Sequence, residues 1–260
     1  INIVDKAEIE NEPCNVNHMK DIAIFLIAGI FISGIFISIV YIFDDTIKNE
    51  KDIQRNLKLE CIGTIPNINK TNQELIIETD PKSYTVECLK TTRTNILYSS
   101  NINNKKVILF TSPRQKEGKS FLVNNIAVAF AKANKKVILV DTNLREVSNR
   151  TNIFNYEPGE GLSDFIKEIS GDKLRNLELS ERYIKETKIP NLHILESGTI
   201  PPNPSELISS KNMKELLDLL KSMYDIILLD GTPSMIFSDS IALSTMVDST
   251  ILVAENKKTK

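Results

Sequence analysis

The sequence predicts an α/β fold in which a parallel sheet carries helices on both faces, preceded by one transmembrane helix. The first observation behind this prediction is an uninterrupted apolar segment at residues 22–43. The second is the alternation of short apolar runs with helical stretches from residue 107 onward. Continuous apolar runs are typical of parallel strands that are buried on both faces, so helices are expected on each side of the sheet.

The apolar segment at residues 22–43 contains no charged side chain. As a helix it would be about 33 Å long, which is enough to cross a hydrocarbon core of roughly 30 Å. A signal peptide has a shorter apolar region, and a core helix would carry a polar face, which this segment lacks. Four basic residues follow the segment, so the positive-inside rule places the downstream part in the cytoplasm. These residues are Lys48, Lys51, Arg55 and Lys58.

The bulk composition excludes several classes of function. The 260 residues carry a formal net charge of −2, which argues against a nucleic-acid binder. The three cysteines include no CxxC pair, which fits free thiols in a reducing compartment better than a disulfide framework. With two histidines and no Cys/His cluster, the sequence predicts no zinc site.

Four regions follow from these patterns. The regions are an extracytoplasmic segment at 1–21, the transmembrane helix at 22–43, the juxtamembrane segment and linker at 44–80, and the cytoplasmic domain at 81–260. The juxtamembrane region contains a polar helix at residues 46–58 and a solvated linker, rich in Asn, Thr and Glu, at residues 67–80.

The cytoplasmic domain alternates strands and helices. Its predicted strands are residues 107–111, 137–141, 192–196, 226–230 and 249–254. Its predicted helices are residues 81–97, 119–133, 161–168, 204–224 and 238–246.

The first apolar run of this domain leads into a loop that closes with Gly118, Lys119 and Ser120 at the start of a predicted helix. A phosphate-binding loop requires this order, because backbone N–H groups and the helix dipole then converge on one point. Lys119 would reach the β- and γ-phosphates, and the Ser120 hydroxyl would lie on Mg²⁺. Pro113 stands where the usual pattern begins with Gly. The sequence therefore predicts a P-loop NTPase-like sheet.

Two aspartates, Asp141 and Asp230, stand where predicted strands end. Ligands of parallel sheets bind beyond the carboxyl ends of the strands. An aspartate at such an end can hold Mg²⁺ or take a proton from an attacking hydroxyl. Each aspartate alone is more simply a helix N-cap or a turn residue, but together with Lys119 the two predict one site.

Several stretches resemble bacterial tyrosine kinases of capsule and exopolysaccharide systems. Asp141 with Arg145, and Asp230, are similar to the second and third nucleotide motifs of that family. Residues 198–207, which end in PPNPSEL, resemble a third family segment; by physical chemistry alone this segment is a turn followed by a helix with Ser205 as N-cap.

The resemblance extends to the N-terminal half of the chain. Residues 43–48 and 63–66 resemble the stretch that follows the last span of a chain-length-determinant (Wzz-type) membrane domain. Glu87, Lys90 and Arg93 resemble the ExxRxxR oligomerisation helix of the family, although this pattern alone also fits a solvated helix face. The resemblance therefore indicates a kinase that is fused to the end of a Wzz-type domain.

The resemblance implies an ATP-dependent protein-tyrosine kinase that uses ATP and Mg²⁺. It implies catalytic roles for Lys119, Asp141 and Asp230, and Mg²⁺ binding by Ser120 together with the two aspartates. Asp141 would activate the tyrosine hydroxyl of a neighbouring subunit. The residues implied to contact the nucleotide are Gln115, Lys116, Glu117, Gly118, Lys119, Ser120, Phe121 and Arg145. For Arg145 two roles stay open, since it would either contact phosphate or hold the loop behind Asp141.

The resemblance also implies partners and a location. The partners are a ring-like homo-oligomer of the chain itself, protein tyrosine substrates, a cognate phosphatase, and the polysaccharide polymerase and export machinery. The location is the bacterial cell membrane, with the kinase domain in the cytoplasm. We expect residues 1–21 to be the remnant of an extracytoplasmic domain, and the C-terminal tyrosine cluster of the family to be missing.

Several positions depart from the family pattern, including Phe121, which stands where a second hydroxyl residue is common. Lys116 stands where Gly is expected, Asn143 replaces an aspartate, and Gly231 replaces a threonine. If residue 116 needs a positive φ, a lysine there costs about 1 kcal/mol. These departures keep open a nucleotide-binding but catalytically weak regulatory subunit. A third alternative is a deviant-loop ATPase that positions cellular components, in which Arg114 would replace that class's lysine, but this alternative leaves the membrane span unexplained.

Overall fold

A computed structural model describes residues 18–43, 46–67, 75–99, 106–146, 153–154, 159–256 and 258–259. It divides into two compact units, Ile1–Thr46 and Ile47–Lys260. In the first unit, helix α1 (His18–Ile42) buries no residue and has a mean hydropathy of 2.7 in its most apolar window. By length and composition α1 can cross a membrane, as the sequence predicts. Most of the predicted extracytoplasmic remnant lies outside the described residues.

The second unit is built on a six-stranded sheet in the order β3-β4-β2-β5-β1-β6. All strand pairs are parallel except β3–β4, which is antiparallel. The five strands predicted from the sequence all form, but β3 was not predicted, because two residues are too short for a pattern. The strands are β1 (Val107–Thr111), β2 (Val137–Asp141), β3 (Lys185–Glu186), β4 (Leu192–Leu195), β5 (Ile226–Asp230) and β6 (Ser249–Leu252).

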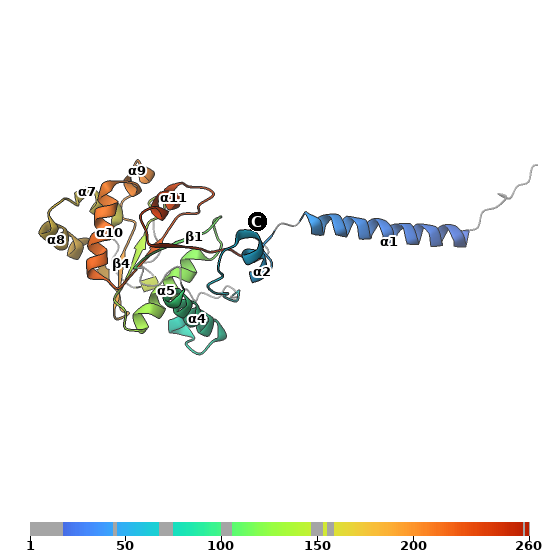
Figure 1. The fold of residues 1–260 in the computed structure, drawn as a ribbon, viewed down its shortest axis with the longest axis horizontal. Helices are drawn as coiled ribbons and strands as arrows, with labels where there is room; N and C mark the ends of the chain where they lie inside the picture. The colour runs from blue at the N-terminus through green and yellow to red at the C-terminus, as the bar shows by residue number, and fades with distance from the viewer. Residues whose placement is uncertain are drawn as a thin grey trace, which may run out of the picture. The chain divides into compact units, whose positions relative to one another are not determined.

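Helices cover both faces of the sheet, which confirms the predicted architecture (Figure 1). Alternate residues of β1 face opposite sides, so Ile108 and Phe110 pack in one apolar cluster and Val107 and Leu109 in the other. The first cluster includes α3 (Ile76–Thr79), α4 (Tyr84–Tyr98) and α5 (Lys119–Lys132). The second includes α7 (Leu162–Glu168), α8 (Lys173–Tyr183), α9 (Pro204–Ile208), α10 (Lys211–Met223) and α11 (Asp239–Ser244).

The structure divides one of the predicted helices into two. Residues 204–224 form α9 and α10, which are separated at Ser209 and Ser210. The Ser210 hydroxyl accepts a hydrogen bond from the Met213 N–H at 3.2 Å and so caps the start of α10. Serine favours the N-cap position over the helix interior, and this local preference ends the longer helix.

The juxtamembrane region also differs from the prediction. The polar helix is shorter than expected and consists of α2 (Glu50–Asp52) followed by a π-helical turn (Ile53–Leu57). The end of the predicted solvated linker forms α3, in which Ile76 and Ile77 are buried. The Ile77 N–H also donates to the Asn125 side chain of α5 at 3.3 Å. Two apolar residues are enough to dock this segment on the α4–α5 layer, whereas residues 68–74 of the linker lie outside the described part of the chain.

His193 on β4 gives the stability of the second unit a pH dependence. Its Nδ1 lies 2.7 Å from the Tyr224 hydroxyl, and burial lowers the pKa of His193 below its ordinary value of 6.5, an effect that Glu186 opposes and Lys136 supports. As the pH falls, the His193 imidazole is therefore protonated in the unfolded chain before it is protonated in the folded protein. The contribution is fully present above about pH 6.5 and is lost as the pH falls through the lower, folded-state pKa.

We predict that the free energy of unfolding of residues 47–260 falls between about pH 7.5 and pH 5.5, and that His193→Gln flattens this slope. Urea unfolding followed by circular dichroism at several pH values measures both. A variant that keeps the wild-type slope would contradict the assignment to His193.

Candidate active site

The sheet order brings the three predicted site elements to one edge. Strand β5 lies between β1 and β2, and Asp141 and Asp230 are register partners at the carboxyl ends of β2 and β5. Both aspartates are buried, with exposed fractions of 5% and 2%. Phe110 of β1 is the other register partner of Asp230, so the chain leaves β1 for the loop at the same edge. The two carboxylates and the loop thus lie together although 89 residues separate Asp141 from Asp230.

The loop before α5 uses two residues in the left-handed region. Gly118 is the N-cap of α5 with φ 82°, and Lys116 has φ 63°. The positive φ at position 116 is the condition under which the sequence predicts strain for a lysine. Glu117 is buried between them, and its carboxylate accepts from the Arg114 N–H at 3.0 Å and from the Thr259 hydroxyl at 2.6 Å. The Glu117 side chain therefore holds the loop through contacts on its buried side. The main-chain N–H groups of the loop are the groups that could bind a phosphate.

Lys119 forms an ion pair with Asp230, and the side chains of the two residues are 12% and 3% exposed. The Lys119 ammonium also lies 3.5 Å from the Ser120 hydroxyl. A buried carboxylate has to be compensated by hydrogen bonds or by a cation, and for Asp230 a cation comes from the first turn of α5. The structure thus brings Lys119, Ser120 and Asp230 together, as the sequence predicts for one site.

The segment after β2 is tied to the end of β5. The Thr142 N–H and hydroxyl both donate to the Asp230 carbonyl, at 3.1 and 2.9 Å. The Asp141 carboxylate accepts from the Asn143 N–H at 3.0 Å. These bonds fix the backbone on which Asp141 stands.

Arg145 contacts protein groups of two later elements. Its Nε and Nη2 lie 2.9 and 3.1 Å from the two carboxylate oxygens of Asp239, and its Nη2 lies 2.8 Å from the Ser205 hydroxyl. Burial alone would raise the pKa of Asp239, but hydrogen bonds from Arg145 and Ser205 outweigh it and lower that pKa. The sequence left open whether Arg145 contacts phosphate or holds the loop behind Asp141, and its contacts here are of the second kind.

Ser205 is not the N-cap of α9, so that prediction was wrong. Asn203 occupies the N-cap position, and Pro204 is the first helical residue, where a missing N–H costs nothing. The Ser205 hydroxyl instead donates to the Asp239 carboxylate at 2.6 Å. No local sequence signal reveals this pairing, since 34 residues separate the two groups.

The close packing around residue 231 gives a physical reason for the glycine that departs from the family motif there. A Cβ atom at this position would lie 2.5 Å from the Ser240 hydroxyl oxygen and 3.0 Å from the Phe110 carbonyl oxygen. The backbone of β1 and the start of α11 therefore approach too closely for a larger residue without a shift.

Phe121 lies on the core side of the loop. Its side chain packs against the apolar cluster of the α4–α5 layer, and its carbonyl accepts from the Asn125 side chain at 2.9 Å. It was predicted among the nucleotide-contacting residues, but its aromatic ring serves the core.

The three predicted oligomerisation residues separate on α4. Glu87 and Lys90 form an exposed ion pair at 2.7 Å. Arg93 instead donates to the Ala129 carbonyl of α5 at 3.1 Å, and its buried Nε has no hydrogen-bond partner among the described residues. Arg93 thus packs on its own protomer, whereas Glu87 and Lys90 face outward.

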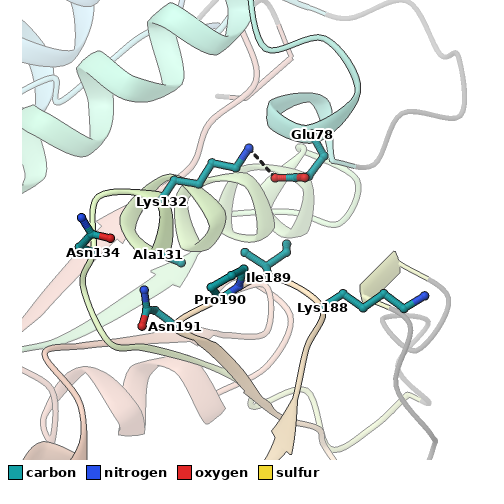
Figure 2. A pocket seen from close by; sticks show the side chains of 8 residues that line it. All are labelled: Glu78, Ala131, Lys132, Asn134, Lys188, Ile189, Pro190 and Asn191. Atoms are coloured by element: carbon teal, nitrogen blue, oxygen red, sulfur yellow. Dashed lines mark ion pairs between the residues drawn. The ribbon is translucent and has the colours of Figure 1, made fainter.

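A pocket of about 270 Å³ lies at the C-terminal end of α5, and Lys119 is at the other end of this helix. Figure 2 shows the side chains that line the pocket. Its wall includes an ion pair between Lys132 and Glu78 at 2.6 Å, together with Asn134 and Asn191. Because α5 has 14 residues, about 21 Å of helix separate this pocket from the phosphate loop. The pocket is therefore not part of the candidate active site.

The donor set fits Mg²⁺ better than a metal held by protein alone. No group of three or more His, Cys, Asp or Glu that could hold a metal occurs in the part of the chain that the structure describes. Mg²⁺ needs only one or two carboxylates, since phosphates and waters supply its other ligands. Asp230 already binds one cation, the Lys119 ammonium, and Asp141 and the Ser120 hydroxyl add two further hard oxygen donors nearby.

Comparisons with known proteins agree with this fold and site. Residues 105–259 match the family model described as an AAA domain. The tyrosine-protein kinase YwqD of Bacillus subtilis (strain 168) is 35% identical over 192 residues, covering 74% of this chain and 77% of YwqD. The tyrosine-protein kinase ptk of Acinetobacter johnsonii is 26% identical over 271 residues, covering 100% of this chain and 36% of ptk. The solved BceF tyrosine kinase domain is 27% identical with a TM-score of 0.70, covering 83% of this chain and 89% of that chain.

The chain therefore belongs to the AAA-domain family and, within it, to the bacterial tyrosine kinases of exopolysaccharide synthesis. The resemblance stated from the motifs is confirmed at this level. The chain spans 77% of YwqD but only 36% of ptk. The individual roles of the site residues remain predictions.

We predict that relief of the strain at residue 116 shows in stability. Lys116→Gly should raise the free energy of unfolding by up to about 1 kcal/mol, because glycine adopts a positive φ without steric cost. Lys116→Val should lower it, since a β-branched residue is disfavoured at positive φ. Urea unfolding of the three proteins gives the order, and a valine variant as stable as the glycine variant would contradict the strain.

Proposed function

We propose that this chain is an ATP-dependent protein-tyrosine kinase that phosphorylates itself and other proteins of a capsule or exopolysaccharide system. The observation that carries the proposal is the ion pair of Lys119 with Asp230, beside Asp141 in the neighbouring strand. This arrangement supports the proposal, because a cation that could bind phosphate, a carboxylate that could hold Mg²⁺ and a candidate base lie at one edge of the sheet. Family membership supports the reaction, since YwqD and BceF are named as tyrosine kinases.

The loop backbone from Gln115 to Ser120 would bind the phosphates of ATP at the N-terminus of α5. Lys119 would leave Asp230 for the β- and γ-phosphates, whose charge competes with the single carboxylate. The vacated Asp230, with Ser120 and Asp141, would then hold Mg²⁺, which supplies neutralisation of phosphate charge when bound. On binding of Mg-ATP, Lys119 would thus exchange Asp230 for phosphate, and Asp230 would exchange Lys119 for Mg²⁺.

Asp141 would act as the general base for the incoming tyrosine. The tyrosine oxygen attacks the γ-phosphorus, the bond to the β–γ bridging oxygen breaks, and the hydroxyl proton passes to Asp141. The Asn143 N–H orients the Asp141 carboxylate by its 3.0 Å hydrogen bond. Asn143 itself adds no charge to the site, unlike the aspartate that the family pattern has there.

The membrane and assembly proposals rest on α1 and α4. Helix α1 would span the bacterial cell membrane once, with residues 44–80 as the juxtamembrane segment and residues 81–260 as the cytoplasmic kinase domain. The exposed Glu87–Lys90 pair would take part in a ring-like homo-oligomer. The cognate phosphatase and the polysaccharide polymerase and export machinery remain proposed partners from the family resemblance.

We predict that Lys119→Met weakens Mg-ATP binding by roughly ten-fold or more, because the site loses its phosphate-directed charge. At saturating Mg-ATP, Asp141→Asn should lower phosphotyrosine formation by roughly 100-fold or more, as expected for loss of a general base. Calorimetry measures the first effect, and anti-phosphotyrosine blotting measures the second.

The matched control for these variants is Lys132→Met, which removes a lysine at the far end of α5 and should change neither quantity. Unchanged affinity in Lys119→Met would contradict the loop assignment. Mg-ATP binding without any phosphotyrosine in the wild type would instead support the regulatory, catalytically weak subunit.

The exposure of the tyrosines predicts which of them accept phosphate. Tyr84 and Tyr98, at the two ends of α4, are 76% and 79% exposed. Tyr183 and Tyr224 are buried, and burial raises the pKa of each to about 12. Helix ends open at the lowest cost, so the two α4 tyrosines can reach the site of a neighbouring protomer.

We predict phosphate on Tyr84 and Tyr98 and none on Tyr183 or Tyr224 after incubation with Mg-ATP. Mass spectrometry of proteolytic peptides identifies the sites, and the double variant Tyr84→Phe/Tyr98→Phe should lose most of the label from these peptides. Phosphate on the two buried tyrosines of the folded protein would contradict the prediction.

A further inference from the structure

We propose that Ser205 and Asp239 are positioning residues for the phosphoryl transfer: together they hold Arg145 and thereby orient the turn that carries Asp141. The proposal rests on the proposed function, in which Asp141 is the base. It also assigns a physical task to the PPNPSEL segment, which the nucleotide motifs alone leave without one.

Three separate elements meet at the Arg145 guanidinium. Arg145 lies in the turn after β2, Ser205 lies in α9, and Asp239 is the first residue of α11. Arg145 reaches both carboxylate oxygens of Asp239, at 2.9 and 3.1 Å, and the Ser205 hydroxyl at 2.8 Å. Ser205 in turn donates to Asp239 at 2.6 Å, so the three side chains close a cycle.

The cycle is rigid for electrostatic and steric reasons. The Asp239 side chain is 1% exposed, so its charge has to be paired, and the two-oxygen contact with a planar guanidinium fixes orientation as well as distance. The Phe237 ring lies 4.5 Å from the guanidinium carbon and covers it. Arg145 is 30% exposed, and its position is set by these three contacts.

A short series of hydrogen bonds connects Arg145 to the base. The main-chain N–H of Arg145 donates to the Asn143 side-chain oxygen at 3.4 Å, and the main-chain N–H of Asn143 donates to the Asp141 carboxylate at 3.0 Å. A displacement of Arg145 would therefore change the turn on which the Asp141 carboxylate depends. Asn143, the amide that replaces a family aspartate, serves here as an acceptor within the turn.

The same support reaches the end of β5. Ser240, next to Asp239 in α11, donates to the Thr232 carbonyl at 2.6 Å, two residues after Asp230. Thr111 at the end of β1 donates to the same carbonyl at 2.7 Å. The start of α11 thus fixes the turns after two strands, one through Asp239 and the other through Ser240.

The segment before Ser205 delivers its hydroxyl to this point. Pro204 begins α9 with a fixed φ, and the Asn203 side chain donates to Glu206 at 2.9 Å. Ile208 on the same short helix is fully buried and anchors α9 in the second apolar cluster. The helix is too short to be held by its own hydrogen bonds, so its position depends on these contacts.

The test uses the full chain in detergent micelles and separates binding from transfer. We expect Asp239→Asn to lower the maximal rate of phosphotyrosine formation by roughly ten- to 100-fold, since a misplaced catalytic group costs this much, and to leave Mg-ATP affinity within about two-fold. Ser205→Ala should show a smaller loss of rate, and Ser205→Thr, which keeps the hydroxyl, should restore it. Ser209→Ala is the matched control, because Ser209 is exposed on the same segment and its hydroxyl donates to the Ser205 carbonyl at 2.7 Å.

A second readout does not depend on kinase activity. Amide hydrogen exchange should become faster at residues 141–146 in Asp239→Asn and Ser205→Ala, and should stay unchanged at residues 115–120 and throughout Ser209→Ala. Unchanged exchange at residues 141–146 would overturn the proposal, and so would a loss of rate that merely follows a loss of affinity or of folded protein. If the wild type forms no phosphotyrosine while exchange responds as expected, the kinase proposal fails and the positioning of this turn stands.

Discussion

The ion pair between Lys119 and Asp230 is the contact around which the candidate site is organised. Asp230 ends the central strand β5, where burial leaves its carboxylate 3% exposed, and Lys119 is the first residue of α5. Removal of the lysine would leave this buried carboxylate without its cation, which costs several kcal/mol of stability. The pair joins the phosphate loop to the middle of the sheet. It also holds, before any nucleotide binds, the two charges that a bound Mg-ATP would use separately.

The turns around this pair are held by side chains from distant elements. Glu117 braces the phosphate loop through the Arg114 N–H and the Thr259 hydroxyl. Arg145 with Asp239 does the same for the turn after β2. Loops have no ladder of backbone hydrogen bonds, and charge-assisted contacts of this kind replace it. The result is a site in which residues other than Lys119, Asp141 and Asp230 hold the surrounding turns.

The segment that follows α1 packs against α4 within the second compact unit. The Asn95 side chain of α4 donates to the Ile62 carbonyl at 2.7 Å, and Ser99 donates to Glu60 at 3.0 Å. On its other side α4 contacts α5 through Arg93. The helix that carries the exposed Glu87–Lys90 pair is thus held between the segment that follows the apolar helix and the helix that begins with the phosphate loop. A displacement of α4 would therefore be felt by both of these elements.

Local sequence patterns determined most of the strands and helices of this protein. The apolar runs predicted β1, β2 and β5 with the bounds that the structure has, because five consecutive buried residues leave few alternatives. The loop sequence predicted the turn into α5, and the uncharged segment predicted α1. Helix α8 and strand β3 were missed, since α8 is mostly polar and β3 has two residues.

Only the tertiary structure decided how the polar groups pair. The sequence placed Lys119, Asp141 and Asp230 in one site because strand ends share an edge, and this rule needs no knowledge of side-chain contacts. It could not decide that Arg145 bonds Ser205, 60 residues away, or Asp239, 94 residues away. It also grouped Arg93 with Glu87, although Arg93 turns inward to α5. Helical and strand periods are local properties of the chain, whereas the partner of a charged side chain depends on which elements the fold packs together.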